Sequence, residues 1–429
     1  MWSGSNGKAS LTISCKGLFT PVGGAKGLQL RGVLPPFLHW VLLITVAAGA
    51  VSCSAAALAQ ERLREDTAPF VDIDWSVALR GSYASNTLTG GAAEAVVAPS
   101  ATLTRNGERT QTTLTSSGAF ALDSTGAVRV DELRVGGTSA YDLDEWTKLS
   151  GSFDLSQTQL RPRHSSLPAN NAMAPIDLTG SASGSVTRKL GQFDLTGRLR
   201  GERFIEGPTT LTDSSTIDNS NQSSWLGEAG FRLGYELTPV VLVFVDGSES
   251  YEAFDAPSPS LGKYLNGRTT QLRGGLSYAL PGTLSAEVSA GRAWYDYTDA
   301  SISDAPGWVY GASVTFTPDE TLTLGGALDS SIGPSSNVPG DTDVYYTLTA
   351  TSGYQVNPWL KLRGRASYDQ TLTVGSGDTA SGYSLGAGLD LITTRHTVWT
   401  ADYLFARDQP ARYQASDTHT VTVGVTFKR

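Results

Sequence analysis

Charged side chains that alternate with apolar ones are the residues of this chain best placed to act on a ligand. In the stretch 360–369, Lys361, Arg363 and Arg365 share one face, whereas the opposite face is apolar, because successive side chains of a strand point to opposite sides. The stretches 193–202 and 225–236 alternate in the same way. Charges that line a water-filled space act on a solute by attraction and repulsion, without breaking bonds. The chemistry that these residues offer is therefore electrostatic selection.

The alternation assigns a set of charged residues to the polar face, and we take them as candidate pore-lining residues. They are Arg198, Arg200, Arg232, Arg273, Lys361, Arg363, Arg365, Glu228, Glu236, Glu287, Asp390 and Asp402. One interpretation is a charged, screened pore whose arginines and carboxylates set the solute preference. The other is that these residues pair across strands and stiffen the wall, and the two are compatible. The cluster of Lys361, Arg363 and Arg365 is the candidate for an anion-favouring patch.

Residues for bond-breaking chemistry are sparse after residue 60. His164, His396 and His419 are the histidines of that region, and both cysteines, Cys15 and Cys53, come earlier. The sequence contains no H-E-x-x-H, nucleophile elbow, P-loop or paired-cysteine metal motif. We therefore expect that the protein is not an enzyme, with no catalytic, cofactor-binding or metal-binding residues.

The elements that would position the charges are β-strands with one uncharged apolar face. In the last segment, T-H-T-V-T-V-G-V-T-F from residue 418, the apolar face carries Val421, Val423, Val425 and Phe427. Similar segments recur back to about Phe193. Their apolar runs of roughly 9–11 residues, with aromatic residues near the ends, match tilted strands that cross a bilayer.

Short turns alternate with longer polar connections. Turns are expected at 238–239, 281–282, 318–319, 357–358 and 393–394, and an Asn-Gly hairpin turn at 106–107. Longer connections are expected at 161–176, 208–224, 255–267, 296–307, 333–341, 375–382 and 408–416. Counting strands between them gives about 18, with 16 as the alternative. An even number places both termini on one side of the membrane, which would be the periplasmic side.

A sheet in hydrocarbon must close on itself, because every backbone N–H and C=O there needs a protein partner. No helix-period apolar segment of about 20 residues follows residue 60, so helices cannot supply the span. We predict an all-β fold, a transmembrane antiparallel up-and-down β-barrel. With about 16–18 strands such a barrel leaves an aqueous lumen unless loops fill it.

The N-terminal region has the order of a secretory signal peptide. Lys26 and Arg31 precede the apolar run 33–51, and Ala57-Leu58-Ala59 follows it. We predict a signal peptide with a long n-region at 1–59, a short periplasmic segment at 60–71 and an outer-membrane barrel at 72–429. Lipid modification of Cys53 is the alternative, although the residues before it fit a lipoprotein signal poorly. The long leader leaves the true translation start open.

The net charge of −9, with 17% charged residues, gives no reason to expect a nucleic-acid partner, which would need a basic patch. High glycine content, 47 residues, suits an all-β chain with many turns. The charge therefore gives no support for a nucleic-acid partner, and the composition identifies no solute.

The chain resembles the outer-membrane β-barrel porins of Gram-negative bacteria known as the second putative β-barrel porin group. The likeness rests on the strand L-G-Q-F-D-L-T-G-R-L, the repeated G-x-x-Y and hairpin units, and the closing V-T-V-G-V-T-F. It covers roughly Phe193 to Arg429 and implies a channel or solute porin. Barrels of this kind commonly end on an aromatic residue, whereas here Lys428 and Arg429 follow Phe427.

The leading hypothesis is an outer-membrane porin that lets small hydrophilic solutes diffuse through passively. The alternatives are a plugged structural or secretion-associated barrel, with 161–176 or 255–267 as the plug, and a secreted soluble all-β binding protein. The expected partners are outer-membrane lipid, the outer-membrane insertion machinery and the solutes. Solute identity, ion selectivity and homo-oligomerisation stay open.

Overall fold

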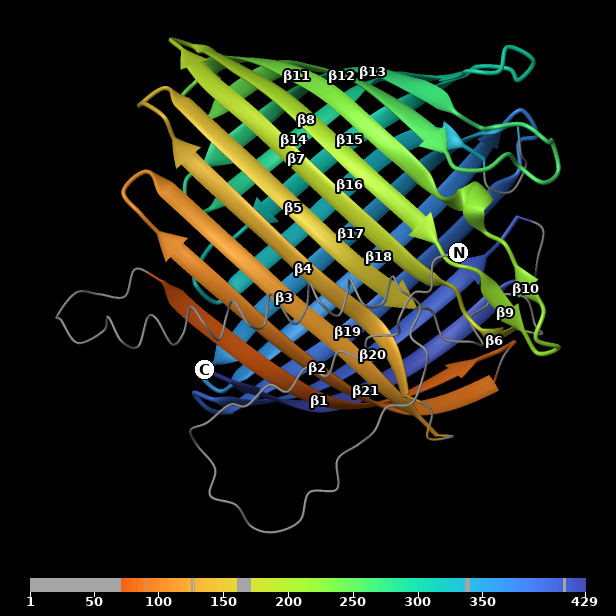
Figure 1. Ribbon diagram of the computed structural model, residues 1–429. Helices are drawn as coiled ribbons and strands as arrows, with labels where there is room; N and C mark the ends of the chain where they lie inside the picture. The colour runs from red at the N-terminus through yellow and green to blue at the C-terminus, as the bar shows by residue number, and fades with distance from the viewer. Residues whose placement is uncertain are drawn as a thin grey trace, which may run out of the picture. The chain divides into compact units, whose positions relative to one another are not determined.

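In the part of the chain that the structure describes, eighteen antiparallel strands form one closed sheet (Figure 1). The computed structural model describes residues 71–429, except 89, 125, 127, 160–170, 336–339 and 412–413. The predicted signal peptide at 1–59 and nearly all of the predicted segment 60–71 lie outside the described residues, as do Cys15, Cys53 and His164. The predicted all-β barrel and its count of about 18 strands are confirmed.

The barrel strands are 12 to 17 residues long. Their bounds are β1 Asp72–Asn86, β2 Gly90–Asn106, β3 Thr110–Asp123, β4 Val128–Asp142, β5 Thr147–Gln159, β7 Ile176–Leu190, β8 Phe193–Glu206, β11 Ser224–Thr238, β12 Val241–Phe254, β13 Gly267–Leu280, β14 Leu284–Tyr297, β15 Ala305–Phe316, β16 Leu322–Pro334, β17 Thr342–Asn357, β18 Leu360–Val374, β19 Thr379–Thr394, β20 Thr397–Gln409 and β21 Ser416–Lys428.

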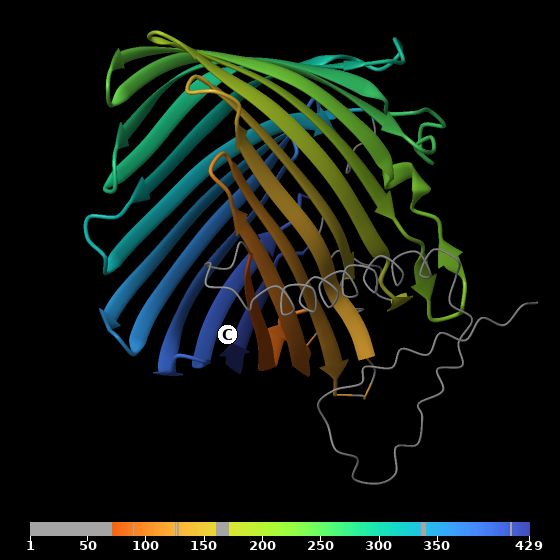
Figure 2. The ribbon, with the colours of Figure 1, turned by 60° about the vertical axis from the view of Figure 1, so that its left-hand side comes forward.

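Pairing of the first and last strands closes the barrel. Residues Ser76–Asn86 of β1 run antiparallel to Thr418–Lys428 of β21, with Leu79 opposite Val425. The two strands, the red-orange and blue ends of the colour scale, lie side by side in Figures 1 and 2. Closure gives every barrel strand a neighbour on both sides, which is the condition for a sheet in hydrocarbon.

The two ends of the barrel differ in the length of their connections. At one end, which we call the turn end, neighbouring strands are joined by residues 107–109, 143–146, 191–192, 239–240, 281–283, 317–321, 358–359 and 395–396. At the other, the loop end, the connections include 160–175, 207–223 and 255–266. β1 begins and β21 ends at the turn end, as the even strand count requires.

Two predicted loops contain short regular elements. Within the predicted loop 161–176 lies β6 (Asn171–Met173), and within 208–224 lie β9 (Thr209–Leu211), β10 (Thr216–Ile217) and the 3-10 helix η1 (Ser220–Gln222). The three strands form a small antiparallel sheet of their own at the loop end. Strands of two or three residues carry too few side chains for alternation to be recognised.

The outer face of the barrel is an exposed apolar belt. On β11, for example, Trp225 is 60% exposed and Phe231 is 56% exposed. Exposed aromatic residues mark both rims of the belt. They are Trp75, Phe193, Trp359, Trp399 and Phe427 toward the turn end, and Tyr83, Trp225, Tyr251, Trp294 and Trp308 toward the loop end. Two aromatic girdles around an apolar band are the arrangement that lipid requires of a barrel.

The ladder between β15 and β16 is shorter than its strands. It joins Gly311–Phe316 to Leu324–Asp329, although β15 begins at Ala305 and β16 extends to Pro334. Side chains satisfy part of the unpaired β15 backbone. The Ser330 hydroxyl accepts from the Tyr310 N–H at 2.5 Å and lies 2.8 Å from the Tyr310 carbonyl, and the Tyr346 hydroxyl donates to the Trp308 carbonyl at 3.3 Å.

No helix among the residues that the structure describes is long and apolar enough to cross a membrane.

Candidate functional site

Strand register assigns the charged candidates to one face of the sheet. In β18, Lys361, Arg363 and Arg365 alternate with Leu362, which is exposed on the outer belt. The same face can be traced from strand to strand around the barrel, because directly opposed residues of neighbouring strands point to the same side of the sheet. Followed in this way, all twelve candidates lie on the face opposite the apolar belt, which is the face toward the lumen.

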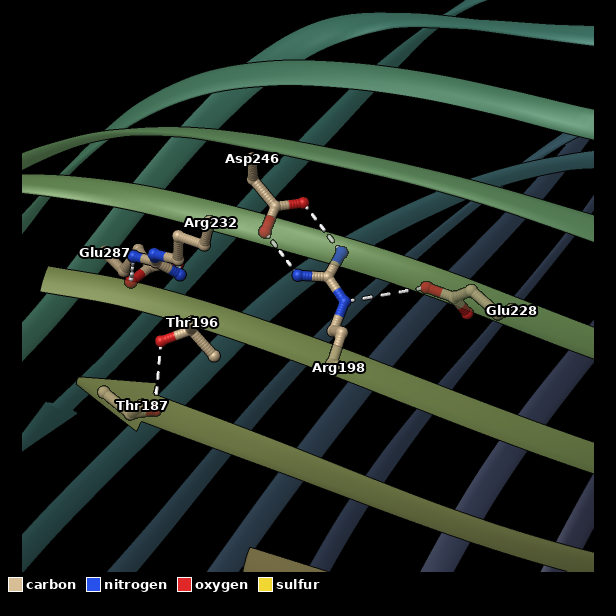
Figure 3. A network of polar contacts seen from close by, with 7 residues as sticks. All are labelled: Thr187, Thr196, Arg198, Glu228, Arg232, Asp246 and Glu287. Carbon is tan, nitrogen blue, oxygen red and sulfur yellow. Dashed lines mark hydrogen bonds and ion pairs between the residues drawn. The ribbon is translucent and has the colours of Figure 1, made fainter. Parts of the chain in front are cut away.

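Arg198 is the centre of a charged cluster on β8, β11 and β12 (Figure 3). Its guanidinium donates two hydrogen bonds to Asp246, at 2.5 and 2.9 Å, and its Nε lies 3.7 Å from Glu228. Gly230 stands opposite Arg198 in the ladder, and a Cβ there would lie 2.6 Å from Arg198 Nε. Glycine therefore leaves the space through which the arginine crosses β11 to reach Asp246.

Arg232 of β11 pairs with Glu287 of β14 across the lumen face of two intervening strands. Its two terminal nitrogens lie 3.1 and 2.6 Å from the Glu287 oxygens, and Figure 3 shows the two groups facing each other. The guanidinium also stacks over the Phe244 ring, 3.4 Å from its centre. A bidentate pair that also rests on an aromatic ring is held in one orientation. The positive charge of Arg232 is therefore held beside the Glu287 carboxylate.

Arg363 of β18 contacts two carboxylates on neighbouring strands. Its Nη2 lies 2.8 Å from Asp390 of β19 and 3.0 Å from Asp402 of β20. Lys361 and Arg365 make no ion pair among the residues that the structure describes. The predicted anion-favouring patch is therefore neutralised at its centre and free at its two flanks.

The remaining candidates divide between paired and unpaired groups. Glu236 pairs with Lys189, and Arg200 pairs with Glu202 of its own strand. Arg273 forms no ion pair in the described part of the chain. Its one hydrogen bond to protein runs from Nη2 to the Ser330 carbonyl at 3.4 Å, and its buried Nε has no partner.

Several lumen-face charges escaped the sequence prediction. Asp246 is one, although it stands as the single charge in V-F-V-D-G-S. Others lie on the first strands, where Arg129 contacts Glu94 at 3.3 Å and Arg134 contacts Asp154 at 2.6 Å. Register also places Arg80 on this face, opposite Gly424. In β4, alternation is broken at Asp131, an extra residue between Val130 and Glu132, which pair with Phe120 and Ala119 of β3; this hides the periodicity.

The histidines of the described region lie away from the charged clusters. His396 is in the β19–β20 turn, where its Nδ1 is 3.0 Å from the Lys428 carbonyl. His419 is on the outer face beside Tyr403, with 2.8 Å between its Nδ1 and the tyrosine hydroxyl. In the described ranges no group of three or more His, Cys, Asp or Glu residues could hold a metal ion.

Open cavities lie against both charged regions of the lumen. One, of about 450 Å³, is lined by Arg198, Arg232, Arg273, Asp246 and Glu287 together with uncharged residues of β16. Another, of about 370 Å³, is lined by Lys361, Arg363, Arg365 and Asp402. Volumes of 300–1,000 Å³ are those of small-molecule sites. Both charged regions can therefore meet a small solute.

Comparisons with known proteins agree with this architecture. A family model described as Putative beta-barrel porin 2 matches residues 73–429. No curated protein matches the chain.

Among solved structures, the chain is similar to Pseudomonas aeruginosa OpdK, crystallised with vanillate, at 11% identity and a TM-score of 0.41, over 83% of this chain and 99% of that one. P. aeruginosa OpdL gives 13% identity and a TM-score of 0.42, over 84% and 98%. Acinetobacter baumannii OccAB4 gives 12% and 0.41, over 83% and 98%.

Proposed function

We propose, from the premise that this chain belongs to the Putative beta-barrel porin 2 family, that it lets small hydrophilic solutes diffuse passively through its lumen. The protein is an outer-membrane β-barrel of the porin type, and membrane lipid surrounds it. Support for passive diffusion comes from the two faces of the sheet.

The observation that carries the proposal is the contrast between those faces. The outer face presents exposed apolar residues between two aromatic rims, whereas the inner face carries the ion pairs of Arg198, Arg232 and Arg363. A barrel of this many strands leaves room for water in its centre. Charges that face water can pair with each other and still act on a passing ion. The two interpretations of the charged face are therefore both supported.

Paired charges give a screened pore with a modest preference. Arg198, Arg232 and Arg363 are each matched by at least one carboxylate within 3.0 Å. Opposed charges at that distance cancel most of each other's field a few ångströms away, and salt screens the remainder. We infer that neutral hydrophilic solutes pass freely and that ion preference comes from unpaired groups, among them Lys361, Arg365 and Arg273.

Liposome swelling tests the proposal. Proteoliposomes that contain the purified protein should swell in isotonic solutions of small sugars, at rates that fall as the sugar becomes larger. Protein-free liposomes are the control for leakage. Swelling no faster than in protein-free liposomes, from a barrel that is correctly inserted, would contradict passive diffusion.

A plugged barrel is the second candidate, and the loop 255–266 is the observation in its favour. The Leu265 carbonyl accepts from Tyr295 at 3.0 Å, so the loop is fastened to a residue of the lumen face. Of the other predicted plug, 161–176, only a part lies in the described residues. Deletion of residues 257–263 would restore swelling to a plugged barrel and would leave an open one little changed.

The outer-membrane location leads to further proposals about insertion, orientation and catalysis. We propose insertion by the outer-membrane machinery, periplasmic termini and no catalytic role. Protease treatment of intact cells that carry C-terminally tagged protein tests the orientation, because a periplasmic tag should be cleaved only after the outer membrane is permeabilised. N-terminal sequencing of the mature protein tests cleavage after Ala59.

A further inference from the structure

The loop-end part of β16 departs from the wall beyond Asp329. If the β15–β16 register continued, Pro306 would stand opposite Pro334. Proline has no N–H to give to a ladder, so neither residue could complete the pairing. The strands separate instead, and Ser330 bonds the β15 backbone through its side chain.

Contacts show that β16 and β17, which stay paired with each other, turn away from β15 toward the inside of the barrel. Gly307 lies on the lumen face of β15, and a Cβ at this position would lie 2.9 Å from Val344 of β17 and 3.2 Å from Ile332 of β16. Glycine therefore permits the close approach. Val309 and Tyr295, also on the lumen face, are 0% and 1% exposed. Residues that face open water are not buried to this degree, so β16 and β17, together with Leu265 of the loop 255–266, cover them from within the lumen.

The buried residues form one apolar cluster. It comprises Ala293, Tyr295, Tyr297, Ile302, Val309, Ile332 and Val344. Along β16 and β17, Ile332 and Val344 have the alternation of lipid-facing residues such as Leu328 and Leu348, and they face each other in register. Their side chains nevertheless contact the inner side of β14 and β15. We call the segments 330–334 and 342–346 the inward-folded segments.

The inward-folded segments reach toward a distant part of the wall. Ser331 and Ile332 line the same cavity of about 450 Å³ as Arg198 and Arg200 of β8. Around the sheet, β8 and β16 are separated by β11, β12, β13, β14 and β15. Both strands can line one small cavity only if β16 narrows the lumen at this place.

An unpaired arginine stands in this narrowed place. Arg273 lies on the lumen face of β13 and reaches the Ser330 carbonyl at 3.4 Å. Its register partner, Asp246, is taken by Arg198. Its Nε is buried and has no hydrogen-bond partner in the described structure.

We propose that the inward-folded segments are a constriction built from the barrel wall itself, and that Arg273 at this constriction binds the carboxylate of small monovalent organic anions as they pass. The inference rests on the proposed channel function and deepens it by naming a solute class. Arg273 lines the cavity, and no carboxylate of the described residues forms an ion pair with it; a guanidinium in this state matches the carboxylate of a solute in geometry and charge.

The surroundings of Arg273 limit the class to small and singly charged anions. The cavity also contains Glu228 and Glu252, and Glu252 accepts a hydrogen bond from the Ser224 hydroxyl at 2.8 Å. These carboxylates repel a second negative charge on a solute. The volume of about 450 Å³ admits a small organic acid.

Zero-current potentials in planar bilayers test the role of Arg273. With potassium acetate at a tenfold gradient, Arg273→Gln should lower the acetate-to-potassium permeability ratio by roughly two- to fivefold, since one unpaired charge is removed from a narrow place. The matched control is Arg268→Gln on the same strand, which removes an outer-face arginine paired with Glu249 at 3.4 Å. Its ratio should equal that of the wild type.

Two results would overturn the role of Arg273. One is an unchanged ratio in Arg273→Gln, and the other is an equal fall in Arg268→Gln. Tripotassium citrate extends the test, because this trivalent anion should show little permeability in the wild type. If the wild-type protein carries no current at all, the channel function itself fails, and this outcome is distinct from both of the others.

Conductance tests the constriction. Gly307→Leu places a side chain where Val344 and Ile332 now lie, so it should displace the inward-folded segments and raise single-channel conductance by about 1.5-fold or more. Ala327→Leu, on the lumen face where the β15–β16 ladder is intact, is the control and should not raise the conductance.

Heat-modifiable gel mobility identifies the variants that fold. Ile332→Ala replaces Gly307→Leu if the latter does not fold. A folded variant with unchanged or lower conductance contradicts the constriction.

Discussion

Arg363 Nη2 lies 2.8 Å from Asp390 and 3.0 Å from Asp402, on the two strands that follow β18 around the barrel. Arg363, the central residue of the predicted anion-favouring patch, thus forms ion pairs with two carboxylates. Lys361 and Arg365 flank it on the same face. The charge that this region presents to a solute is therefore smaller than three basic residues in sequence suggest.

Asp402→Asn should increase the anion preference of the channel. The substitution removes one of the two carboxylates at Arg363 and leaves the guanidinium to Asp390 alone. We expect the chloride-to-potassium permeability ratio to rise about two- to threefold, measured as a zero-current potential in a potassium chloride gradient. Asp417→Asn is the control, because Asp417 pairs with Arg407 at 3.6 Å on the outer face. A control shift as large as that of Asp402→Asn would refute a local effect at Arg363.

Val423→Arg should destabilise the folded barrel. Val423 is 55% exposed on the outer face near the middle of β21, and an arginine on the lipid face at the bilayer midplane costs about 2–4 kcal/mol. Thr422→Arg places the same side chain one residue away on the lumen face and should cost far less. Urea unfolding in lipid vesicles measures both variants. Equal losses of unfolding free energy would show that the two faces are wrongly assigned.

Ser330→Ala should destabilise the junction between β15 and β16. The Ser330 hydroxyl contacts both the N–H and the carbonyl of Tyr310, at 2.5 and 2.8 Å, and Ser330 is buried. Removing it leaves two backbone groups without a partner, at a cost of about 1–3 kcal/mol. Ser331→Ala, exposed to the lumen, is the matched control and should be nearly neutral. The comparison uses the free energy of unfolding, and no difference between the two variants would be the contrary result.

Asp319 should make stability depend on acid pH. In the β15–β16 turn its carboxylate accepts hydrogen bonds from the Thr321 hydroxyl at 2.6 Å and from the Thr321 and Leu322 N–H groups at 2.8 and 3.0 Å. These hydrogen bonds lower the pKa of Asp319 from its ordinary value of 3.8. A lowered folded pKa contributes stability that is full above pH 3.8 and is lost as the pH falls through the folded pKa.

Asp319→Asn should therefore flatten the change in unfolding free energy between pH 5 and pH 2. The measurement is the urea midpoint across this range. Glu320→Gln is the control, since it removes a neighbouring carboxylate and keeps the Asp319 hydrogen bonds. A pH dependence in Asp319→Asn identical to that of the wild type would count against the assigned role.

Sequence alternation was sufficient to predict the barrel, because a membrane strand must separate its faces residue by residue. Trp225, Phe231 and Tyr235 were placed on the apolar face, and the structure has them on the outer belt. The predicted turns at 281–282 and 318–319 lie within connections at the turn end, and the predicted turn at 357–358 overlaps the connection 358–359 by one residue. The predicted turn at 393–394 lies at the end of β19, and the chain reverses at 395–396.

The inward-folded segments could not be predicted from alternation. Ile332 and Val344 have the spacing of lipid-facing residues, and alternation reports only the faces of a strand that stays in the sheet. The signal that existed was a pair of prolines, Pro306 and Pro334, which becomes meaningful once the register of β15 and β16 is known. Pairing of Arg198 with Asp246 is likewise hidden in the sequence, because it depends on two registers, that of β8 with β11 and that of β11 with β12.

Single-channel recording of the purified protein in a planar bilayer tests the central claim most directly. An open charged lumen predicts discrete conductance steps that grow in proportion to salt concentration and persist at low voltage. A barrel that inserts, shows heat-modifiable mobility and yet carries no current would contradict an open channel.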